Sequence, residues 1–499
     1  MNYEEKNSGT LHMGESTSTQ IAVTQPLGRD GTPARLVTLF GSLGPGGEKH
    51  VGYVFDVGEA TYQETIVAVN GPIRSITLEV PAAAWYEREL HDQYGVEIVG
   101  HPDLRPLVFH ENWPDGVYPM AGAVESVPWS NRQYRFLEVQ GEGIAEVAVG
   151  PVHAGIIEPG HFRFSVVGDT VLHLELRHFY THKGTEKLFE GSLVDAGTMI
   201  AESVSGDNCF AHAVAYSQAV EKACQSDVPS RASAIRLIGL ELERLVSHIS
   251  DVGGLCTDVG FSVAAASAAR IKESLLQASS ECCGTRYWRG IAVPGGLRCD
   301  LDSKRVLSFS QAISLAAHEF SDLARVILET PSIQNRFETA GILRRDTARE
   351  LAIVGPVARA SGIDLDVRRD HPYGHYDRAQ LEVPVTHYGD VMARARIRIA
   401  EAAISARLIQ QTVDVLPPGP VLVPLEILGE FQGSSAVESP RGELYYWLEG
   451  HDGRLTRCHI KSPSFQNWPA MPFAVADNII ADFPLINKSF NLSYSGCDR

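Results

Sequence analysis

Hydrophobic and polar residues alternate with a period of two near the start of the chain. This pattern predicts strands at residues 34–43, 50–58 and 75–81, separated by glycine-rich turns at 44–49 and 69–74. Residues 83–97 follow with helical spacing, since Trp85, Leu90 and Tyr94 can share one side of a helix. The first part of the chain is therefore expected to be a small mixed unit.

Helical spacing dominates a longer second part, from about residue 185 to 415. Its clearest examples are residues 232–255 and 388–413, the latter ended by Leu416-Pro417-Pro418. Strands are predicted on either side of the helices, at 161–169, 170–179, 442–450 and 454–463. The chain is thus expected to be α+β, with a mainly helical second domain that has peripheral strands.

Composition shifts suggest where these parts begin and end. Residues 1–30 are polar and rich in Ser, Thr and Gly, which is typical of a disordered tail. We expect a small α+β domain at 31–125, a polar linker at 126–144 and the large domain at 145–499.

Charge and cysteine content narrow the function classes. The net charge of −18 argues against nucleic-acid binding, because phosphate contacts need clustered Lys and Arg. No run of about 18 apolar residues is present, so no membrane span is expected. The eight cysteines form no CxxC pair, which is typical of reduced, structural thiols and argues against iron–sulfur ligation by this chain.

Residues 80–107 carry a long signature that resembles the 30-kDa-type subunit of respiratory complex I. It consists of Trp85, Glu87, Arg88, Glu89, Asp92, Gly95, Gly100, His101, Pro102, Asp103 and Arg105. The resemblance implies a structural, docking role for this domain.

The second domain resembles the large subunit of group-4 [NiFe]-hydrogenases and its relative, the 49-kDa-type subunit of complex I. The motifs that carry this resemblance include GPVHAGIIEPGHFRFSV, ELERLVSHISDVGGLCTDVGF, VPGGLRCDL and ESPRGELYYW. Fusion of the two units in this order resembles the formate-hydrogenlyase type of large subunit. The resemblance implies an oxidoreductase subunit that works beside an iron–sulfur small subunit and membrane-embedded subunits.

The nickel ligands of that family are missing at the matching positions. Two CxxC pairs hold the metals in the hydrogenases, and this chain has Ser205 and Asn208 at the first pair and Ser493 and Gly496 at the second. A nickel–iron centre needs soft, ionised thiolates. We therefore expect no metal site here, and no cleaved extension after Arg499 of the kind that nickel subunits carry.

Glu158 and Arg441 are candidate catalytic residues. Glu158 matches the glutamate that passes protons in the hydrogenases, and a carboxylate in a low-dielectric pocket can relay protons; pairing with Arg163 is the structural alternative. Arg441 matches an arginine above the metal pocket. It can bind an anion or a carbonyl group, or pair with a carboxylate.

His161 and Asp258 resemble a histidine and aspartate pair of the complex I quinone site. Such a pair can exchange a proton near neutral pH. The tyrosine of that quinone site falls at Gly206, and His153 is an alternative to His161. Quinone is thus a possible ligand, in a pocket formed by residues 153–161, 203–212, Arg441 and 489–497.

The remaining candidates lie on two predicted helices. His212 belongs to the pocket segment, while Arg244 and His248 share one helix face and can tune a neighbouring iron–sulfur cluster or form a structural network. Residues 205–208 are also good helix N-caps. Cys209 and Cys497, each one residue beyond a lost ligand, can be isolated buried thiols or approach each other in a two-cysteine site.

These residues favour a peripheral subunit on the cytoplasmic side of a prokaryotic membrane. It would couple electron arrival at a partner's iron–sulfur cluster to quinone reduction, or to a conformational signal for ion transport. A non-catalytic scaffold and a working nickel–iron hydrogenase are the alternatives.

Overall fold

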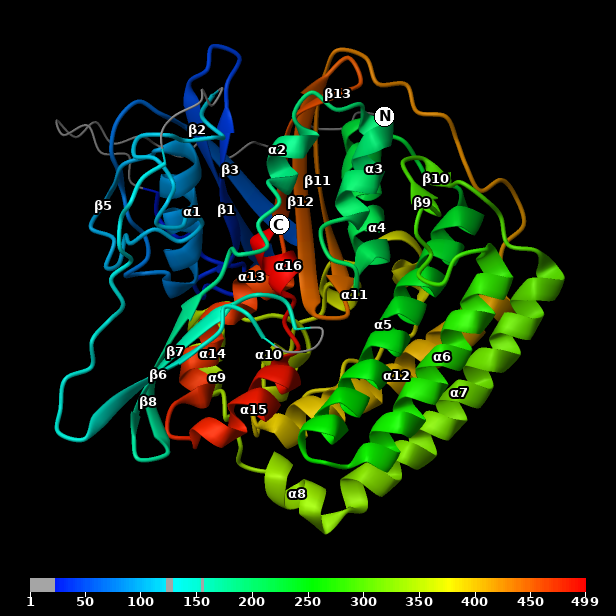
Figure 1. Cartoon of the computed structure of the whole chain (residues 1–499). Helices are drawn as coiled ribbons and strands as arrows, with labels where there is room; N and C mark the ends of the chain where they lie inside the picture. The colour runs from blue at the N-terminus through cyan, green and yellow to red at the C-terminus, as the bar shows by residue number, and fades with distance from the viewer. Residues whose placement is uncertain (1–22, 123–128, 154–156) are drawn as a thin grey trace.

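A computed structural model describes residues 23–122, 129–153 and 157–499 of the chain. Most of the predicted tail and residues 126–128 of the predicted linker lie outside the described residues. In Figure 1 the N-terminal unit (blue) lies beside a sheet from the C-terminal part (orange), shorter helices (teal to green) lie along the other side of that sheet, and the long helices extend to the lower right. The expected α+β class is confirmed.

The N-terminal unit is a three-stranded antiparallel sheet with one long helix. Its elements are β1 (Arg35–Leu43), β2 (Lys49–Gly58), β3 (Thr61–Val69), α1 (Ala84–Tyr94), and a short parallel pair, β4 (Ile73–Arg74) and β5 (Ile98–Val99). Strands β1 and β2 are buried along nearly their whole length. The reason is that α1 covers one face of the sheet while residues 430–461 cover the other.

One predicted strand of this unit is wrong, and the long strand β3 was missed, as were the two-residue strands β4 and β5. Residues 75–80 form a turn because the buried carboxylate of Glu87 accepts hydrogen bonds from Ser75 Oγ, Ile76 N at 2.7 Å and Thr77 Oγ1 at 2.7 Å. Strand β3 alternates between exposed and partly buried side chains at the sheet edge. That alternation was present in the sequence but was not recognised.

A second antiparallel sheet and three helices begin the large domain. The sheet comprises β6 (Ile144–Val149), β7 (His161–Val167) and β8 (Thr170–Arg177), and the helices are α2 (Thr185–Phe189), α3 (Val194–Glu202) and α4 (Cys209–Ala223). Strands β7 and β8 were predicted from their alternation. Helix α4 is buried along most of its length, so its start is held firmly in the interior.

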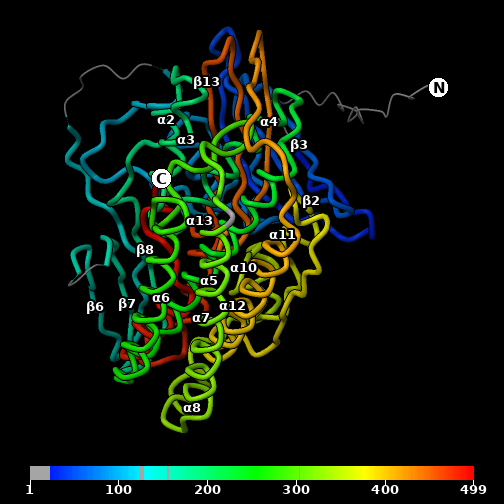
Figure 2. The backbone as a smooth tube through the Cα atoms, turned by 90° about the vertical axis from the view of Figure 1, so that its right-hand side faces the viewer, coloured from blue at the N-terminus to red at the C-terminus, as the bar shows by residue number. Residues whose placement is uncertain are grey.

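Four long helices pack side by side to form the helical body. They are α5 (Ser230–Asp258), α6 (Ser262–Cys283), α7 (Ser303–Glu329) and α12 (Val391–Asp414). Short elements connect them: β9 (Ala292–Val293), β10 (Gly296–Leu297), α8 (Pro331–Phe337), α9 (Arg345–Glu350), α10 (Gly355–Ala360) and α11 (Val367–Asp370). In the side view of Figure 2, α8 lies at the lower end of this body. Within the described ranges, none of the helices is long and apolar enough to cross a bilayer.

The C-terminal part returns to a sheet and ends in short helices. The sheet contains β11 (Glu430–Ser439), β12 (Gly442–His451) and β13 (Arg454–Lys461), and the helices are α13 (Pro463–Asn467), α14 (Met471–Val475), α15 (Phe483–Phe490) and α16 (Tyr494–Asp498). Strand β11 was not predicted. Its Gly433 lies against the backbone of α4, where an added Cβ would be 2.2 Å from the Ala219 carbonyl oxygen.

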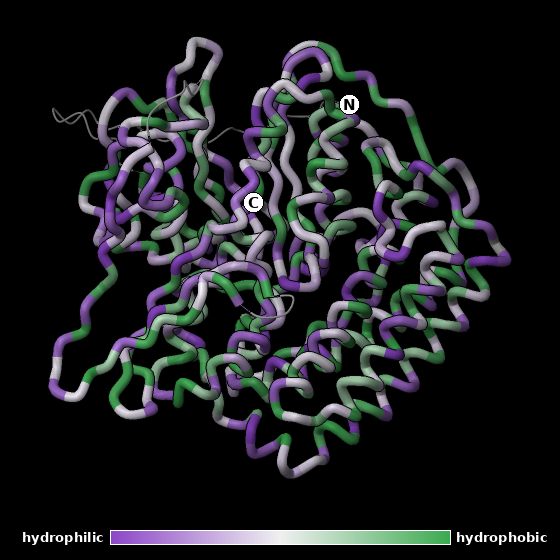
Figure 3. The backbone as a smooth tube through the Cα atoms, viewed as in Figure 1, coloured by the Kyte–Doolittle hydropathy of each residue, from purple (hydrophilic) through white to green (hydrophobic). Residues whose placement is uncertain are grey.

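Polar residues are buried as well as apolar ones. Figure 3 shows hydrophobic and hydrophilic stretches alternating along the long helices, as expected where each helix buries one side. Arg359, Asp366 and Arg368 are all fully or almost fully buried, and Asp366 pairs with both arginines.

Candidate functional site

Three of the four positions that match the nickel ligands meet in the folded chain. Ser205 Oγ and Ser493 Oγ lie 2.9 Å apart although 288 residues separate them in sequence. Ser493 Oγ also accepts a hydrogen bond of 2.8 Å from the backbone N–H of Gly496, where it caps the short helix α16. The resemblance drawn from the sequence therefore aligned positions that are neighbours in space.

Arg441 closes one side of this group by an ion pair with Asp207. Its Nη2 lies 2.5 Å from Asp207 Oδ2, and Ser205 Oγ donates to the other oxygen of the same carboxylate. The Nε of Arg441 donates to the Asn491 carbonyl. Arg441 is 7% exposed, and its Nη1 has no hydrogen-bond partner among the described residues. The guanidinium thus keeps one donor free for a ligand or a water molecule.

Glu158 approaches the same group from the strand side. Its Oε2 accepts a 2.9 Å hydrogen bond from the backbone N–H of Ser495, and the Ser495 hydroxyl lies 3.2 Å from Ser493 Oγ. Arg163, the alternative partner considered for Glu158, pairs instead with Glu146. Glu158 is therefore hydrogen-bonded to the backbone of the segment that carries the serine hydroxyls.

Asn208 occupies the N-cap position of α4 but does not cap it by its side chain. The carboxylate of Glu243 on α5 accepts hydrogen bonds from Phe210 N at 2.8 Å and Ala211 N at 3.1 Å instead. The side-chain capping expected of residues 205–208 is thus wrong for α4, because a carboxylate from a neighbouring helix takes that place. Asn208 Oδ1 is buried and has no partner within the described part of the chain.

Glu243 is a site residue that sequence reasoning missed. Burial raises the pKa of Glu243 to about 8, with a smaller contribution from Asp207, although the two backbone N–H groups favour the charged form. In the sequence, Glu243 is one polar residue of a helix whose apolar residues are spaced for packing. Its contact with the start of α4 is created only by the fold, which brings α5 against that end.

His212 and His153 are held by single contacts. His212 Nδ1 lies 2.8 Å from the hydroxyl of Tyr446, and burial lowers its pKa to about 3, so the ring is neutral. His153 Nε2 lies 2.7 Å from the Gly160 carbonyl, which is a structural contact at the start of β7. Gly206 is exposed, and Arg289 is the nearest side chain to it.

The structure gives His161 and Asp258 different partners. His161 Nδ1 lies 3.2 Å from the Gly150 carbonyl, while Asp258 forms a 2.8 Å ion pair with Lys488 Nζ. Burial raises the pKa of Asp258, and Lys488 opposes that shift. No direct contact joins the two predicted residues in the described ranges, so their cooperation at a quinone stays a prediction.

Arg244 and His248 belong to a buried ionic cluster behind the site. Arg244 donates to the carbonyls of Glu438 and Ser439, and His248 Nε2 lies 2.8 Å from Glu401. The sequence indicated the shared helix face but not the acidic partners, which lie far along the chain.

A nickel–iron centre does not fit the residues present. The four matching positions offer two hydroxyls, one amide and no side chain at Gly496. Burial raises the pKa of Cys209 to about 12 and that of Cys497 well above its usual range, which keeps both thiols protonated. All eight cysteines are free, and no metal-binding group of three or more acidic, His or Cys residues occurs in the described part of the chain.

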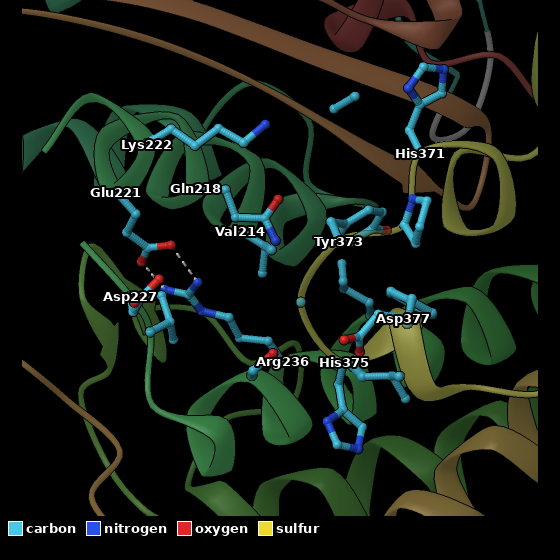
Figure 4. Close-up of a pocket in the computed structure, with 18 of the residues that line it drawn as sticks. Val214, Gln218, Glu221, Lys222, Asp227, Arg236, His371, Tyr373, His375 and Asp377 are labelled. Atoms are coloured by element: carbon cyan, nitrogen blue, oxygen red, sulfur yellow. Dashed lines mark hydrogen bonds and ion pairs between the residues drawn. The ribbon is translucent and has the colours of Figure 1, made fainter. Parts of the chain in front are cut away.

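A separate polar cavity of about 840 Å³ lies at the other end of α4. Gln218 and Lys222 of α4 and His375 of the loop after α11 line it, and Glu221 pairs there with Arg236 (Figure 4). None of the residues singled out in the sequence lines this cavity.

Comparison with known proteins agrees with the fold and the motifs. Residues 41–125 match the family of the respiratory-chain NADH dehydrogenase 30-kDa subunit, and residues 258–431 and 428–499 match that of the 49-kDa subunit. The chain is 35% identical to formate hydrogenlyase subunit 5 of Escherichia coli (strain K12), covering 85% of this chain and 76% of the relative. It is 28% identical to an NADH-quinone oxidoreductase subunit of Bacteroides thetaiotaomicron, covering 84% and 83%.

A solved structure of a related protein supports the same family assignment. A chain from the membrane-bound sulfane sulfur reductase, described as an archaeal respiratory membrane complex, superposes with a TM-score of 0.68 at 25% identity, covering 72% of this chain and 99% of that one. The chain therefore belongs to the family that includes the 49-kDa and 30-kDa subunits of respiratory-chain NADH dehydrogenase and the related subunits of formate hydrogenlyase and hydrogenase, which are oxidoreductases.

Proposed function

We propose that the chain is a nickel-free subunit of a membrane-associated redox complex related to complex I. It couples electron arrival at an iron–sulfur cluster in a partner small subunit to reduction of an acceptor, with quinone as the first candidate, or to ion transport. The observation that carries the proposal is the 2.9 Å contact between Ser205 and Ser493. Hydroxyl groups meet where the hydrogenases need thiolates.

The residues around this contact suggest how an acceptor is handled. The free Nη1 of Arg441 can donate to a carbonyl or an anionic group, and the ion pair with Asp207 holds the guanidinium in place. Glu158 accepts from the backbone N–H of Ser495, and a proton relay from this carboxylate would continue through the hydroxyls of Ser495 and Ser493, which are within hydrogen-bond reach of each other.

The same family membership suggests the partners and the location. We infer that membrane-embedded, complex I-like subunits and an iron–sulfur small subunit bind the chain on the cytoplasmic side of the membrane. One structural relative is part of an archaeal respiratory membrane complex, which supports membrane association of this chain.

A non-catalytic scaffold is the second candidate, and one observation favours it. Ser493 accepts from Gly496 N and contacts Ser205 and Ser495, while Ser205 donates to Asp207. These hydroxyls thus satisfy one another without a ligand. In a scaffold, this group would only hold α4 and α16 together.

Substitution of Arg441 distinguishes the two functions. The complex is purified through a tag on this chain, and electron transfer from an artificial reductant to a quinone analogue is measured for Arg441→Met and for the control Arg270→Met. Arg270 forms an exposed ion pair with Glu319. A redox pocket predicts loss of electron transfer in Arg441→Met with the complex still assembled. Full activity in Arg441→Met would leave the scaffold as the better description.

A further inference from the structure

A cluster of eight charged or titratable side chains is sealed inside the large domain, behind the candidate site. All eight are at most 1% exposed. Its members are Glu241, Arg244, His248, Arg359, Asp366, Arg368, Glu401 and Glu438. They come from α5, α10, α11 and its N-cap, α12 and β11, so the cluster ties the helical body to the C-terminal sheet.

Ion pairs connect the cluster without a break. Arg368 lies 3.0 Å from Glu241 and 2.6 Å from Asp366. Arg359 contacts three carboxylates, at 2.8 Å to Glu401, 2.9 Å to Glu438 and 3.3 Å to Asp366. Arg244 lies 3.4 Å from Glu241, and His248 lies 2.8 Å from Glu401. Each carboxylate of the cluster therefore forms an ion pair with at least one guanidinium.

The charges in this cluster do not balance. It contains three arginines and four carboxylates, so with a neutral histidine it would carry one net negative charge in the interior. An uncompensated buried charge is costly, and such a site binds a proton instead.

Neighbouring charges do not remove the imbalance, because they pair outside the cluster: Arg369 with Asp364 and Asp370, and His371 with Asp56. Arg398 pairs with Asp251 at 3.0 Å. On the sheet side, Arg35 and Lys461 face Glu443 and Asp56, which are two cations and two carboxylates.

We propose that this cluster is a buried proton-binding site that holds one exchangeable proton on Glu438. The charged and titratable groups that face Glu438 are Arg359 from α10, Arg244 from α5, Asp366 and Arg368 at α11, Lys461 from β13 and Tyr373, whose hydroxyl accepts from the Glu438 backbone N–H. The backbone N–H of Val367 donates to Glu438 Oε2 at 3.2 Å, which leaves Oε1, beside Arg359, as the oxygen without a backbone donor among the described residues.

The choice of Glu438 over His248 follows from their surroundings. Burial, and then the neighbouring carboxylate of Asp366, raise the pKa of Glu438 to about 7. Burial lowers the pKa of His248 in spite of its contact with Glu401, so the ring gives up its proton first. The proton that neutralises the excess negative charge is therefore bound by the carboxyl group of Glu438 and not by His248.

The site lies two residues from the turn that carries Arg441. Arg244 donates to the carbonyls of Glu438 and Ser439, and the backbone N–H of Arg441 donates to Ser439 Oγ at 3.3 Å. Hydrogen bonds through Arg244 and Ser439 thus connect Glu438 to the backbone of Arg441 at the candidate site. Proton uptake by Glu438 would compensate the negative charge that an acceptor gains on reduction. This role rests on the proposed function, whereas the protonation of Glu438 does not.

The first test is the pH dependence of stability. A pKa raised from 4.5 to about 7 in the folded chain stabilises it fully below the unfolded value, and this contribution is lost as pH rises through 7. For this group the unfolding equilibrium constant of the full chain should rise about tenfold between pH 6 and pH 8. In Glu438→Gln the cluster has three cations and three anions at both pH values, so this tenfold contribution should be lost, while the contribution of Glu243, whose pKa is also raised, remains in both proteins.

Glu221→Gln is the matched control. Glu221 is buried and pairs with Arg236 at 2.6 Å, outside the cluster. Its loss leaves an arginine that stays charged, so stability should fall equally at pH 6 and pH 8 and the wild-type pH dependence should remain. A pH dependence that is unchanged in Glu438→Gln would overturn the proposal.

Infrared spectroscopy of the full chain provides a second readout. Because the raised pKa of Glu243 also keeps a carboxyl proton in this pH range, the measured quantity is the difference between wild type and Glu438→Gln. This difference should contain the carbonyl band of a protonated carboxylic acid at pH 6 and lose it by pH 8. A difference spectrum without that band at pH 6 contradicts a proton on Glu438. A purified wild-type complex that shows this band but transfers no electrons to the quinone analogue would instead count against the proposed function.

Discussion

Replacing Glu443 by glutamine should loosen the contact between the N-terminal unit and the rest of the chain. Glu443 is fully buried on β12 and lies 2.7 Å from both Arg35 of β1 and Lys461 of β13. It also accepts a 2.9 Å hydrogen bond from Tyr62 of β3. One carboxylate thus joins three strands from two sheets.

The expected loss follows from the charges left behind. Arg35 is partly exposed and keeps Asp56 at 3.0 Å, so it remains compensated. Lys461 is fully buried and, among the described residues, keeps no carboxylate within ion-pair distance. Breaking a buried pair in this way costs about 3–5 kcal/mol of unfolding free energy.

The pH dependence of the variant gives a second, independent expectation. Burial already lowers the pKa of Lys461, and without Glu443 it should fall further. A lysine whose folded pKa lies below its unfolded value of 10.5 destabilises most at low pH, so the variant should regain about 1.4 kcal/mol per pH unit as pH rises between those two values.

Urea unfolding of the full chain at pH 7 and pH 9, followed by tryptophan fluorescence, measures both quantities. Glu59→Gln is the control, because Glu59 pairs with Arg29 on the surface of the same unit and its loss should cost less than about 1 kcal/mol. A Glu443→Gln variant that is as stable as wild type at pH 7 would refute this view of the contact.

Two further substitutions test the site and the sheet behind it. Cysteines at Ser205 and Ser493 should form a disulfide on mild oxidation, detected by peptide mapping, because the two hydroxyls are 2.9 Å apart; absence of the bond would mean that these segments do not meet. Gly433→Ala should destabilise the chain by about 1–3 kcal/mol, because the new Cβ would overlap the Ala219 carbonyl. Gly122→Ala, which meets nothing within 4 Å, should melt at the wild-type temperature, and equal melting of both variants would contradict the close approach of β11 to α4.

The sequence predicted much of the architecture because its periodic segments are long. Helix α5 and helix α12 were recognised within a few residues of their ends from apolar spacing alone. Short elements were harder, since Ser75–Val80 is bent by a buried carboxylate from α1 and β11 is polar where it meets α4. Such contacts depend on segments that are far apart in sequence.

The candidate site was foreseen only in part. Motif resemblance brought Ser205 and Ser493 together correctly, because both lie next to recognisable sequence. It gave no sign of Asp207 as the partner of Arg441, of Glu243 at the start of α4, or of Glu438 in the buried cluster. Those roles are set by burial and by ion pairs, which a local pattern does not reveal.

Metal analysis with electron paramagnetic resonance is the first measurement to make on the whole complex, purified through a tag on this chain. Iron–sulfur signals without nickel are expected, because hydroxyls and a glycine stand where thiolates would be needed. Stoichiometric nickel would contradict a nickel-free subunit and would direct attention to Cys209 and Cys497 as ligands in spite of their burial.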